Sequence, residues 1–310
     1  MTAIPSFPEF SPLALHHQAA IESYTRIFPP YSDYTFPSLW SWNIQEKIEV
    51  SVLNGNLVVR FTDYLTNEKF LSFLGSKEVN ETLEALFALI EDAPDHLGYL
   101  KLIPEHNLQG IRLNDAYEVV EDHDNHDYVY SIQELVSLSG SKYQKRRNKI
   151  QQFLKKYQWQ AAELNLSCAR TCRDMESLCE TWTKRQLLKN NDVQNDIDAL
   201  KRLTQATDKI CLSGVGVYVD GVLAGYALNE FNHHQFATNL FEHADINYAG
   251  VFTFLRKQVA SRLQKDGYLY LNHQQDLGIE GLRKSKRVFR PAFFLKKFII
   301  RRAGKTASDT

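Results

Sequence analysis

The sequence predicts a two-lobed protein of the α/β class (α+β), in which mixed, mostly antiparallel sheets are flanked by helices. Three observations support this prediction. The chain has 310 residues, about twice the length of a typical domain. Hydrophobic residues make up 44% of it, which is enough for two cores. Segments that alternate like strands are joined by short turns and followed by amphipathic helical segments, an order typical of antiparallel-rich α/β domains.

Residues 1–130 are expected to form the N-terminal lobe. Asn54 and Gly55 separate two alternating apolar runs, a strong signal for a tight hairpin turn. Asn80 can cap a helix that ends near residue 92. The expected helices are 11–28 and 80–92, the expected strands are 48–53, 57–65, 69–74, 99–103 and 116–121, and the proline-broken aromatic stretch 28–43 is expected to be a loop.

Residues 131–302 are expected to form the C-terminal lobe, with 303–310 as a tail. Ser139 or Ser141 can cap its first helix, which carries a run of basic side chains. Asp220 and Gly221 mark a second hairpin. The later expected helices are 174–190, 196–207, 248–264 and 278–286, and the expected strand segments are the hairpin 210–228, 235–243, 268–272 and the run 292–300.

The formal net charge of -1 conceals a strong asymmetry along the chain. Residues 1–134 hold 21 acidic and 7 basic side chains, whereas residues 135–310 hold 16 acidic and 29 basic ones. The asymmetry predicts attraction between the lobes and favours an anionic ligand for the C-terminal half. Four basic residues near the C-terminus are interpreted as tail charges: Lys296, Lys297, Arg301 and Arg302.

Composition excludes several classes of protein. Four cysteines in 310 residues do not make a disulfide framework. Cys168, Cys172 and Cys179 are spaced like one apolar helix stripe, so reduced and buried thiols are expected. No apolar run reaches the length of a membrane span, and the first ten residues do not resemble a signal peptide. We therefore expect a cytoplasmic protein without a transmembrane segment.

The polar stretch 122–127 (DHDNHD) contains residue types that bind metals. Consecutive His and Asp residues in a loop seldom converge on one ion, because their side chains point in different directions. A solvated junction between the lobes is therefore favoured over a metal site, and no bound metal is expected.

The element order of the C-terminal half resembles the N-acetyltransferase (GNAT) superfamily. In that fold a loop before the central helix offers backbone N–H groups, and the positive end of the helix dipole, to a phosphate or pyrophosphate. The residues at this place, 246–250 (INYAG), differ from the superfamily's Gln/Arg-x-x-Gly-x-Gly loop. This departure disfavours ordinary acetyl-CoA binding, and acyl-CoA stays the alternative donor.

Several ordered motifs resemble one branch more closely, the catalytic domains of phosphatidylglycerol lysyltransferases and their soluble relatives. The motifs are 127–130 (DYVY), 138–148 (LSGSKYQKRRN) with Phe153, 241–245 (FEHAD), 272–278 (NHQQDLG), 281–286 (GLRKSK) with Arg290 and Pro291, and the aromatic segment 37–43. The resemblance covers nearly the whole chain. It implies two fused GNAT-like acyltransferase lobes and transfer of an aminoacyl group from charged tRNA.

The chain also departs from that branch. We expect no counterpart of the membrane-embedded half, so that a lipid acceptor would be reached from solution. The resemblance implies a carboxylate near position 274, where this chain has Gln274. If that carboxylate takes part in the relatives' chemistry, activity here differs from theirs.

Aminoacyl transfer needs a deprotonated nucleophile, a held donor ester and a polarised carbonyl. Glu242, at the end of a predicted strand, is the candidate general base, with a salt bridge as the structural alternative. Strand alternation turns Glu242 and His243 to opposite faces. Asp245 is an alternative base or amine-binding group, and Asp276 could bind the amine or cap the next helix.

Basic and polar side chains are predicted to hold the phosphates of the donor. Helical spacing would place positions 283, 286, 287 and 290 on one face. Contacts to phosphates rather than bases are expected, and a solvated basic face is the alternative. The candidate binding residues are Lys145, Arg146, Arg147, Tyr248, Asn272, Arg283, Lys286 and Arg287.

Three hypotheses follow for the function. The first is an aminoacyl or acyl transferase that uses charged tRNA, or another phosphate-bearing donor, and a small-molecule, lipid or peptide acceptor. The second is a CoA-dependent N-acyltransferase. The third is a non-catalytic protein that binds RNA or another anion.

Overall fold

The computed structural model describes residues 4–62, 67–93, 95–111, 116–187 and 195–304. The chain folds into two compact units that share the sequence unevenly. The first unit consists of residues 1–127, 275–280 and 294–310, and the second of 128–274 and 281–293. Both units are mixed α/β structures, as predicted, but the C-terminal segment of the chain belongs to the first unit.

The first unit contains a four-stranded and a three-stranded sheet, with orders β1-β2-β3-β4 and β5-β14-β6. All of their strand pairs are antiparallel. The elements are β1 (Ser11–Pro12), η1 (Leu15–His17), α1 (Gln18–Thr25), α2 (Phe36–Trp42), η2 (Ile44–Glu46), β2 (Glu49–Leu53), β3 (Asn56–Thr62), β4 (Lys69–Leu74), α3 (Val79–Asp92), β5 (Tyr99–Pro104), α4 (Glu105–Leu108), β6 (Tyr117–Glu121), η3 (His123–Asn125) and β14 (Lys297–Arg302).

The predicted hairpin of the first unit is confirmed. Strands β2 and β3 pair in register from Glu49 opposite Arg60 to Leu53 opposite Asn56. Asn54 and Gly55 have φ angles of 52° and 73°, the left-handed values that a tight two-residue turn requires. Glycine accepts such an angle without steric cost.

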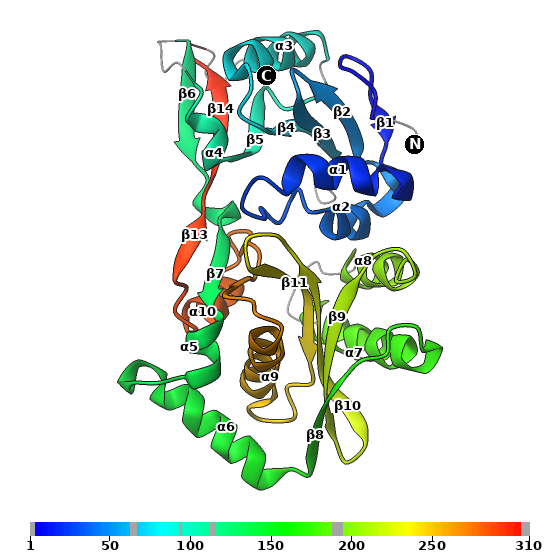
Figure 1. Cartoon of the computed structure of the whole chain (residues 1–310), viewed down its shortest axis with the longest axis vertical. Helices are drawn as coiled ribbons and strands as arrows, with labels where there is room; N and C mark the ends of the chain where they lie inside the picture. Colours follow the sequence, from blue (N-terminus) through cyan, green and yellow to red (C-terminus); the bar gives the residue numbers. More distant parts are fainter. Residues whose placement is uncertain (1–3, 63–66, 94, 112–115, 188–194, 305–310) are drawn as a thin grey trace. The chain divides into compact units, whose positions relative to one another are not determined.

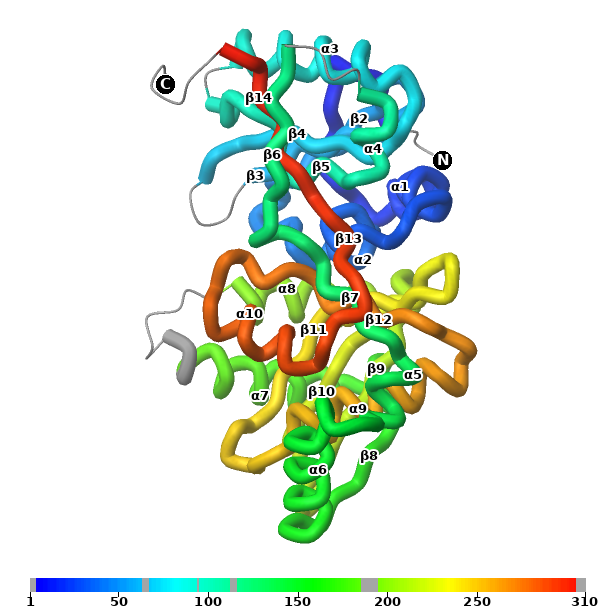
Figure 2. The backbone as a smooth tube through the Cα atoms, turned by 90° about the vertical axis from the view of Figure 1, so that its left-hand side faces the viewer, coloured from blue at the N-terminus to red at the C-terminus, as the bar shows by residue number. Residues whose placement is uncertain are grey.

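The C-terminal strand β14 completes the three-stranded sheet between β5 and β6, and Figure 2 shows it in red beside β6. Ile300 of β14 is fully buried in the core that α3 and the sheets share. The Lys297 side chain is also fully buried, and its Nζ lies 2.7 Å from Asp127 Oδ1 and in an ion pair with Asp33. Lys297 was therefore wrongly interpreted as a tail charge.

The second unit is built on the sheet β13-β7-β12-β11-β10-β9-β8. Strands β11 and β12 are parallel, and the pairs β7–β12, β8–β9, β9–β10 and β10–β11 are antiparallel. The elements are β7 (Asp127–Ser131), α5 (Ile132–Ser137), η4 (Ser141–Tyr143), α6 (Gln144–Lys156), β8 (Trp159–Glu163), α7 (Ala169–Leu187), α8 (Asn195–Thr204), β9 (Leu212–Val219), β10 (Val222–Phe231), β11 (Phe236–Ala244), α9 (Val251–Lys265), β12 (Tyr270–Asn272), α10 (Glu280–Arg287) and β13 (Phe293–Leu295).

Helices cover both faces of this sheet (Figure 1). Helices α5, α6 and α9 pack on one face, where Leu135, Phe153 and Phe254 join a continuous core with apolar side chains of β9 and β10. Helices α7 and α8 lie on the other face. The predicted second hairpin is confirmed, since Asp220 and Gly221 join β9 to β10 with φ angles of 50° and 81°.

Several predicted element boundaries are wrong. The stretch expected to be a loop contains the helix α2, which begins after Thr35 with Pro37 in its first turn, a position that proline tolerates. The helix expected from residue 11 begins at Gln18, after the short strand β1. Helix α3 starts after Glu78 rather than at an Asn80 cap, and α6 has no serine cap. Residues 63–65 and 188–190 of the expected elements lie outside the described residues.

The cysteines are free thiols, as predicted. Cys179 on α7 is buried, whereas Cys168 and Cys172 are half-buried, so the expected buried stripe is only partly formed. Among the described residues, no helix combines the length and apolarity needed to cross a bilayer.

Candidate active site

The parallel strands β11 and β12 separate after a short pairing, and this opening positions the site. Residues Phe236–Thr238 pair with Tyr270–Asn272, and β11 continues alone to Ala244 on that side. The side chain of Gln274 enters the gap, where its Nε2 donates to the carbonyls of Asn239 (2.7 Å) and Leu240 (3.0 Å). A carboxylate at position 274 could not donate to these two carbonyls, because it is an acceptor when ionised.

Glu242 projects from the separated part of β11 into a buried ion pair with Arg256 of α9. Arg256 Nη2 donates to Glu242 Oε1 at 2.5 Å, and Arg256 Nε donates to Oε2 at 3.2 Å. The two side chains are 7% and 6% exposed. His273 Nε2 lies 3.4 Å from Glu242 Oε2 and forms the third member of this buried cluster.

The charges of the cluster follow from its burial and pairing. Burial and the nearby Arg256 guanidinium lower the pKa of His273 to about 4, so its ring is uncharged at neutral pH. Burial alone would raise the pKa of Glu242, but Arg256 and His273 hold it well below its usual value. A carboxylate with a depressed pKa is a weak proton acceptor. The role of Glu242 as a general base stays a prediction, and this pairing counts against it.

Aromatic rings enclose the guanidinium of Arg256. Its Cζ lies 4.1 Å from the ring centre of Phe289 and 5.9 Å from that of Tyr130. Arg146 lies over Phe289 as well, with its Cζ 5.7 Å from the ring centre. Burial and the charge of Arg256 lower the pKa of Arg146. The second unit thus holds two arginines near the Phe289 ring.

Arg256 has unused hydrogen-bonding capacity. Within the described part of the chain, its Nη1 is buried without a hydrogen-bond partner. A buried donor left without a partner costs about 1–3 kcal/mol, and a carbonyl or carboxylate oxygen of a substrate would satisfy it.

His243 faces the opposite side of the sheet from Glu242, as strand alternation predicted. The Tyr226 hydroxyl lies 3.1 Å from His243 Nδ1, and the Trp182 ring of α7 packs edge-on against the imidazole at 4.7 Å. Burial lowers the pKa of His243 to about 4. His243 is therefore a neutral core residue.

The loop between β11 and α9 rests on helix α6. The Tyr157 hydroxyl accepts a hydrogen bond from the Ala249 amide at 3.2 Å, and the Tyr157 ring packs edge-on against Tyr248 at 5.4 Å. Gly250 has a φ of 96° and lies so close to α6 that a Cβ there would stand 2.6 Å from the Lys149 carbonyl oxygen. Glycine is therefore required for this approach.

A cleft of about 460 Å³ lies where this loop meets α6. Its lining residues are Gln152, Lys155, Lys156 and Ala249. The N-terminus of α9 follows Ala249 and Gly250, so the positive end of the helix dipole and two exposed lysines occur together. This combination is suited to a phosphate group.

The two predicted carboxylates near the loops form local turns. Asp245 accepts from the Asn247 amide at 3.0 Å and shapes the loop before α9. Asp276 is 1% exposed and accepts from the Gly278 amide at 3.0 Å, so it shapes the turn before α10, and its predicted roles in amine binding or helix capping stay predictions. Asn272 is fully buried and accepts from the Gln274 amide at 2.8 Å.

The predicted basic residues do not form one surface. Lys286 is buried, and its Nζ donates to the His273 carbonyl at 2.5 Å, so it is not part of an exposed face. Helix α10 ends at Arg287, before position 290. Arg147 donates to the Gly140 carbonyl at 2.7 Å and supports the turn before α6. Lys145 and Arg287 are exposed, and Arg283 is half-buried.

Sequence reasoning missed Arg256, His273 and Lys155 with Lys156 as members of the site. Arg256 carried a usable signal, because it lies at helical spacing from the apolar residues Phe252, Val259 and Leu263 and so falls on the apolar face of the helix. A charge at such a position is buried only with a partner. The identity of that partner depends on the packing of α9 on β11.

Comparison with known proteins agrees with this architecture. The family model for phosphatidylglycerol lysyltransferase, C-terminal, matches residues 25–301. The match spans most of the chain and includes both units.

Three solved structures share the fold at low sequence identity. A conserved protein of unknown function from Bacteroides thetaiotaomicron VPI-5482 has a TM-score of 0.80 and 23% identity, covering 94% of this chain and 98% of that one. The C-terminal domain of a putative lysylphosphatidylglycerol synthetase from Agrobacterium fabrum has a TM-score of 0.65 and 10% identity over 94% and 93% of the two chains. L-PGS from Bacillus licheniformis has a TM-score of 0.64 and 11% identity over 99% and 96%.

Proposed function

This chain belongs to the phosphatidylglycerol lysyltransferase C-terminal family, and we propose that it transfers an aminoacyl group from a charged tRNA to a hydroxyl or amine acceptor. The observation that carries the proposal is the cleft between α6 and the N-terminus of α9. Lys155 and Lys156 line this shallow, open cleft of about 460 Å³, which a phosphate group can approach from solvent. The phosphates at the 3′ end of a tRNA suit this basic cleft.

The loop before α9 favours tRNA over CoA as the donor. In this loop the amides of Asn247, Tyr248 and Val251 donate to Asp245 Oδ1, the Asp245 carbonyl and the Tyr248 carbonyl, respectively. The Ala249 amide donates to the Tyr157 hydroxyl. These four N–H groups are committed within the protein. A pyrophosphate that relied on loop amides, as in CoA-dependent acyltransferases, would have to displace those bonds.

The reaction exchanges one ester bond for a new ester or amide bond. The acceptor oxygen or nitrogen attacks the aminoacyl carbonyl carbon, the bond from that carbon to the ribose oxygen breaks, and the proton of the nucleophile passes to that oxygen. Negative charge develops on the carbonyl oxygen in the transition state, so a fixed donor near it accelerates the step. Arg256 Nη1 supplies such a donor once the substrate opens the buried cluster around it, and Glu242 acts as a positioning residue that holds the guanidinium.

The test replaces both cleft lysines and measures tRNA binding as a function of salt concentration. We expect Lys155→Glu/Lys156→Glu to weaken binding and to reduce the slope of log K against log salt concentration by about 1.4–1.8, because two phosphate contacts are lost. The control is Lys209→Glu/Lys265→Glu, which makes the same change of charge at two exposed lysines of the second unit outside the cleft. Equal slopes for the two double variants would reject the cleft as the tRNA site.

A further inference from the structure

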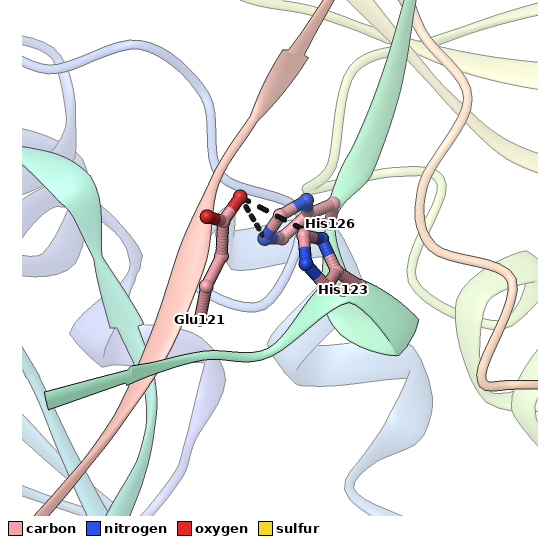
Figure 3. Close-up of side chains that lie close together, drawn as sticks. All are labelled: Glu121, His123 and His126. Atoms are coloured by element: carbon pink, nitrogen blue, oxygen red, sulfur yellow. Dashed lines mark ion pairs between the residues drawn. The ribbon is translucent and has the colours of Figure 1, made fainter.

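A second group of chemically active side chains lies in the first unit, outside the candidate active site. Glu121 ends strand β6, and His123 and His126 belong to the turn that follows. Figure 3 shows the carboxylate and the two imidazole rings pointing toward one another. Glu121 Oε1 lies 3.6 Å from His123 Nδ1 and 3.6 Å from His126 Nε2. One ligand atom from each of the three residues falls within 4.8 Å of the others.

His126 contributes a nitrogen atom that lacks a partner. The residue is 5% exposed, and in the described part of the chain its Nε2 is buried without a hydrogen bond. Its ring also forms a hydrogen bond with the backbone of Lys297. A carbonyl that accepts from one ring nitrogen leaves the other with a lone pair, and metal-bound histidines are oriented in this way.

The lone pair of His126 Nε2 faces an acceptor rather than a donor. Glu121 Oε1 carries lone pairs of its own, and the 3.6 Å separation is too long for a hydrogen bond. Two acceptors at this distance are stabilised by a cation between them. In tetrahedral zinc sites, with bonds of about 2.0–2.2 Å, neighbouring ligand atoms lie about 3.4 Å apart. The two distances from Glu121 Oε1 are close to that separation.

We propose that Glu121, His123 and His126 form a binding site for a divalent transition-metal ion, with Zn²⁺ as the best match. One carboxylate and two imidazoles make a nitrogen and oxygen ligand set that zinc prefers over calcium or magnesium. Three protein ligands leave a fourth coordination position for water or another small ligand. His123 is 74% exposed, which places that position at the surface.

One cation already competes for the carboxylate. Lys296 Nζ lies 3.2 Å from Glu121 Oε1, and its side chain is 42% exposed. The ammonium can move into solvent when the metal binds, because an exposed ion pair contributes little stability. The Lys296 ammonium therefore competes with the metal for Glu121, and removal of Lys296 is expected to tighten metal binding.

The test is a Zn²⁺ titration of the metal-free full chain by calorimetry, with Co²⁺ as a spectroscopic substitute. We expect one equivalent to bind, and His123→Gln to weaken it by about 100-fold or more, because one ligand is lost. His123 is the first choice for substitution. Its side chain is exposed and makes few packing contacts, so the variant should fold like the wild type. The matched control is His233→Gln, at an exposed histidine of the second unit, which should leave the affinity unchanged.

Two further results discriminate the site from adventitious binding. Lys296→Gln should bind Zn²⁺ several-fold more tightly than the wild type, whereas a nonspecific site would not respond. The Co²⁺ spectrum should lack the thiolate charge-transfer band that cysteine ligands would produce. Failure of the wild type to bind Zn²⁺, equal affinities for wild type and His123→Gln, or a thiolate band would each overturn the proposal.

Discussion

Arg256 and Glu242 form a buried pair of opposite charges in the second unit. Each is almost fully removed from water, and each has the other as its principal partner of opposite charge. Burial lowers the pKa of Arg256 and raises that of Glu242, but the pairing reverses both shifts, so both groups are charged at neutral pH. The pair is therefore stable only as a unit.

Removal of one partner should be costly. We expect Glu242→Gln to lower the free energy of unfolding by about 3–5 kcal/mol, because it leaves the Arg256 charge buried and unpaired. The double variant Glu242→Leu/Arg256→Met should recover much of that loss. Denaturant unfolding measures both changes.

An exposed ion pair provides the control for this prediction. Arg262 and Glu163 are paired with side chains 37% and 57% exposed, and Glu163→Gln should cost less than about 1 kcal/mol. If Glu242→Gln lowered the free energy of unfolding by as little as Glu163→Gln does, the buried pair would not be a stabilising unit. Any loss of transfer activity in Glu242→Gln must be measured below the temperature at which that variant unfolds.

At the scale of single elements, the start of α9 is the critical feature of the site. Gly250 combines a left-handed backbone with a close approach to the Lys149 carbonyl. Gly250 is the last residue of the loop between β11 and α9, which also carries Ala249 to the cleft. A displacement of this loop would therefore change the cleft between α6 and α9.

This geometry predicts a difference between two glycines with similar backbones. Gly221→Ala, at a φ of 81° with open space around the Cβ, should cost about 1 kcal/mol for the left-handed conformation alone. Gly250→Ala should cost about 1–3 kcal/mol more, because its Cβ clashes with backbone. Thermal or denaturant unfolding of the two variants tests this difference, and equal losses of stability would show that the contact with α6 is not tight.

Local signals account for the elements that could be predicted. Asn-Gly and Asp-Gly pairs identified both hairpins because only left-handed angles close such short turns. Helix α2 could not be predicted from the prolines and aromatic residues of the stretch 28–43. Its stability comes from burial of Phe36 and Leu39 rather than from helix propensity. The candidate base Glu242 was identified from its strand, whereas its partner Arg256 depends on packing between elements.

At the scale of the whole molecule, some of the basic charge of the C-terminal half lies in the acidic first unit. The basic C-terminal segment belongs to the acidic first unit, where Lys297 pairs with Asp33 and Asp127. Arg302 in the same strand pairs with Glu84 and Glu91. The two units nevertheless keep opposite net charges, with 23 acidic and 12 basic side chains in the first and 14 acidic and 24 basic ones in the second. No local signal could have predicted the place of the C-terminal segment, because the return of β14 to β5 and β6 is a long-range pairing.

Membership of the family does not by itself identify the substrate of this chain. The family accounts for the two units and the order of their elements, and the cleft with Lys155 and Lys156 accounts for an anionic donor. In the proposed reaction, the aminoacyl group is recognised through the ester end of the tRNA. The central claim of the account is therefore a preference for charged over uncharged tRNA.

A competition titration tests this claim most directly. A labelled, amide-linked aminoacyl-tRNA analogue, which cannot be turned over, is bound to the full chain and displaced by the same tRNA without its aminoacyl group or by acetyl-CoA. We predict that uncharged tRNA competes at least about tenfold less well, equivalent to about 1.4 kcal/mol, and that acetyl-CoA competes least. Equal competition by the two tRNAs, or stronger competition by acetyl-CoA, would contradict aminoacyl transfer from tRNA.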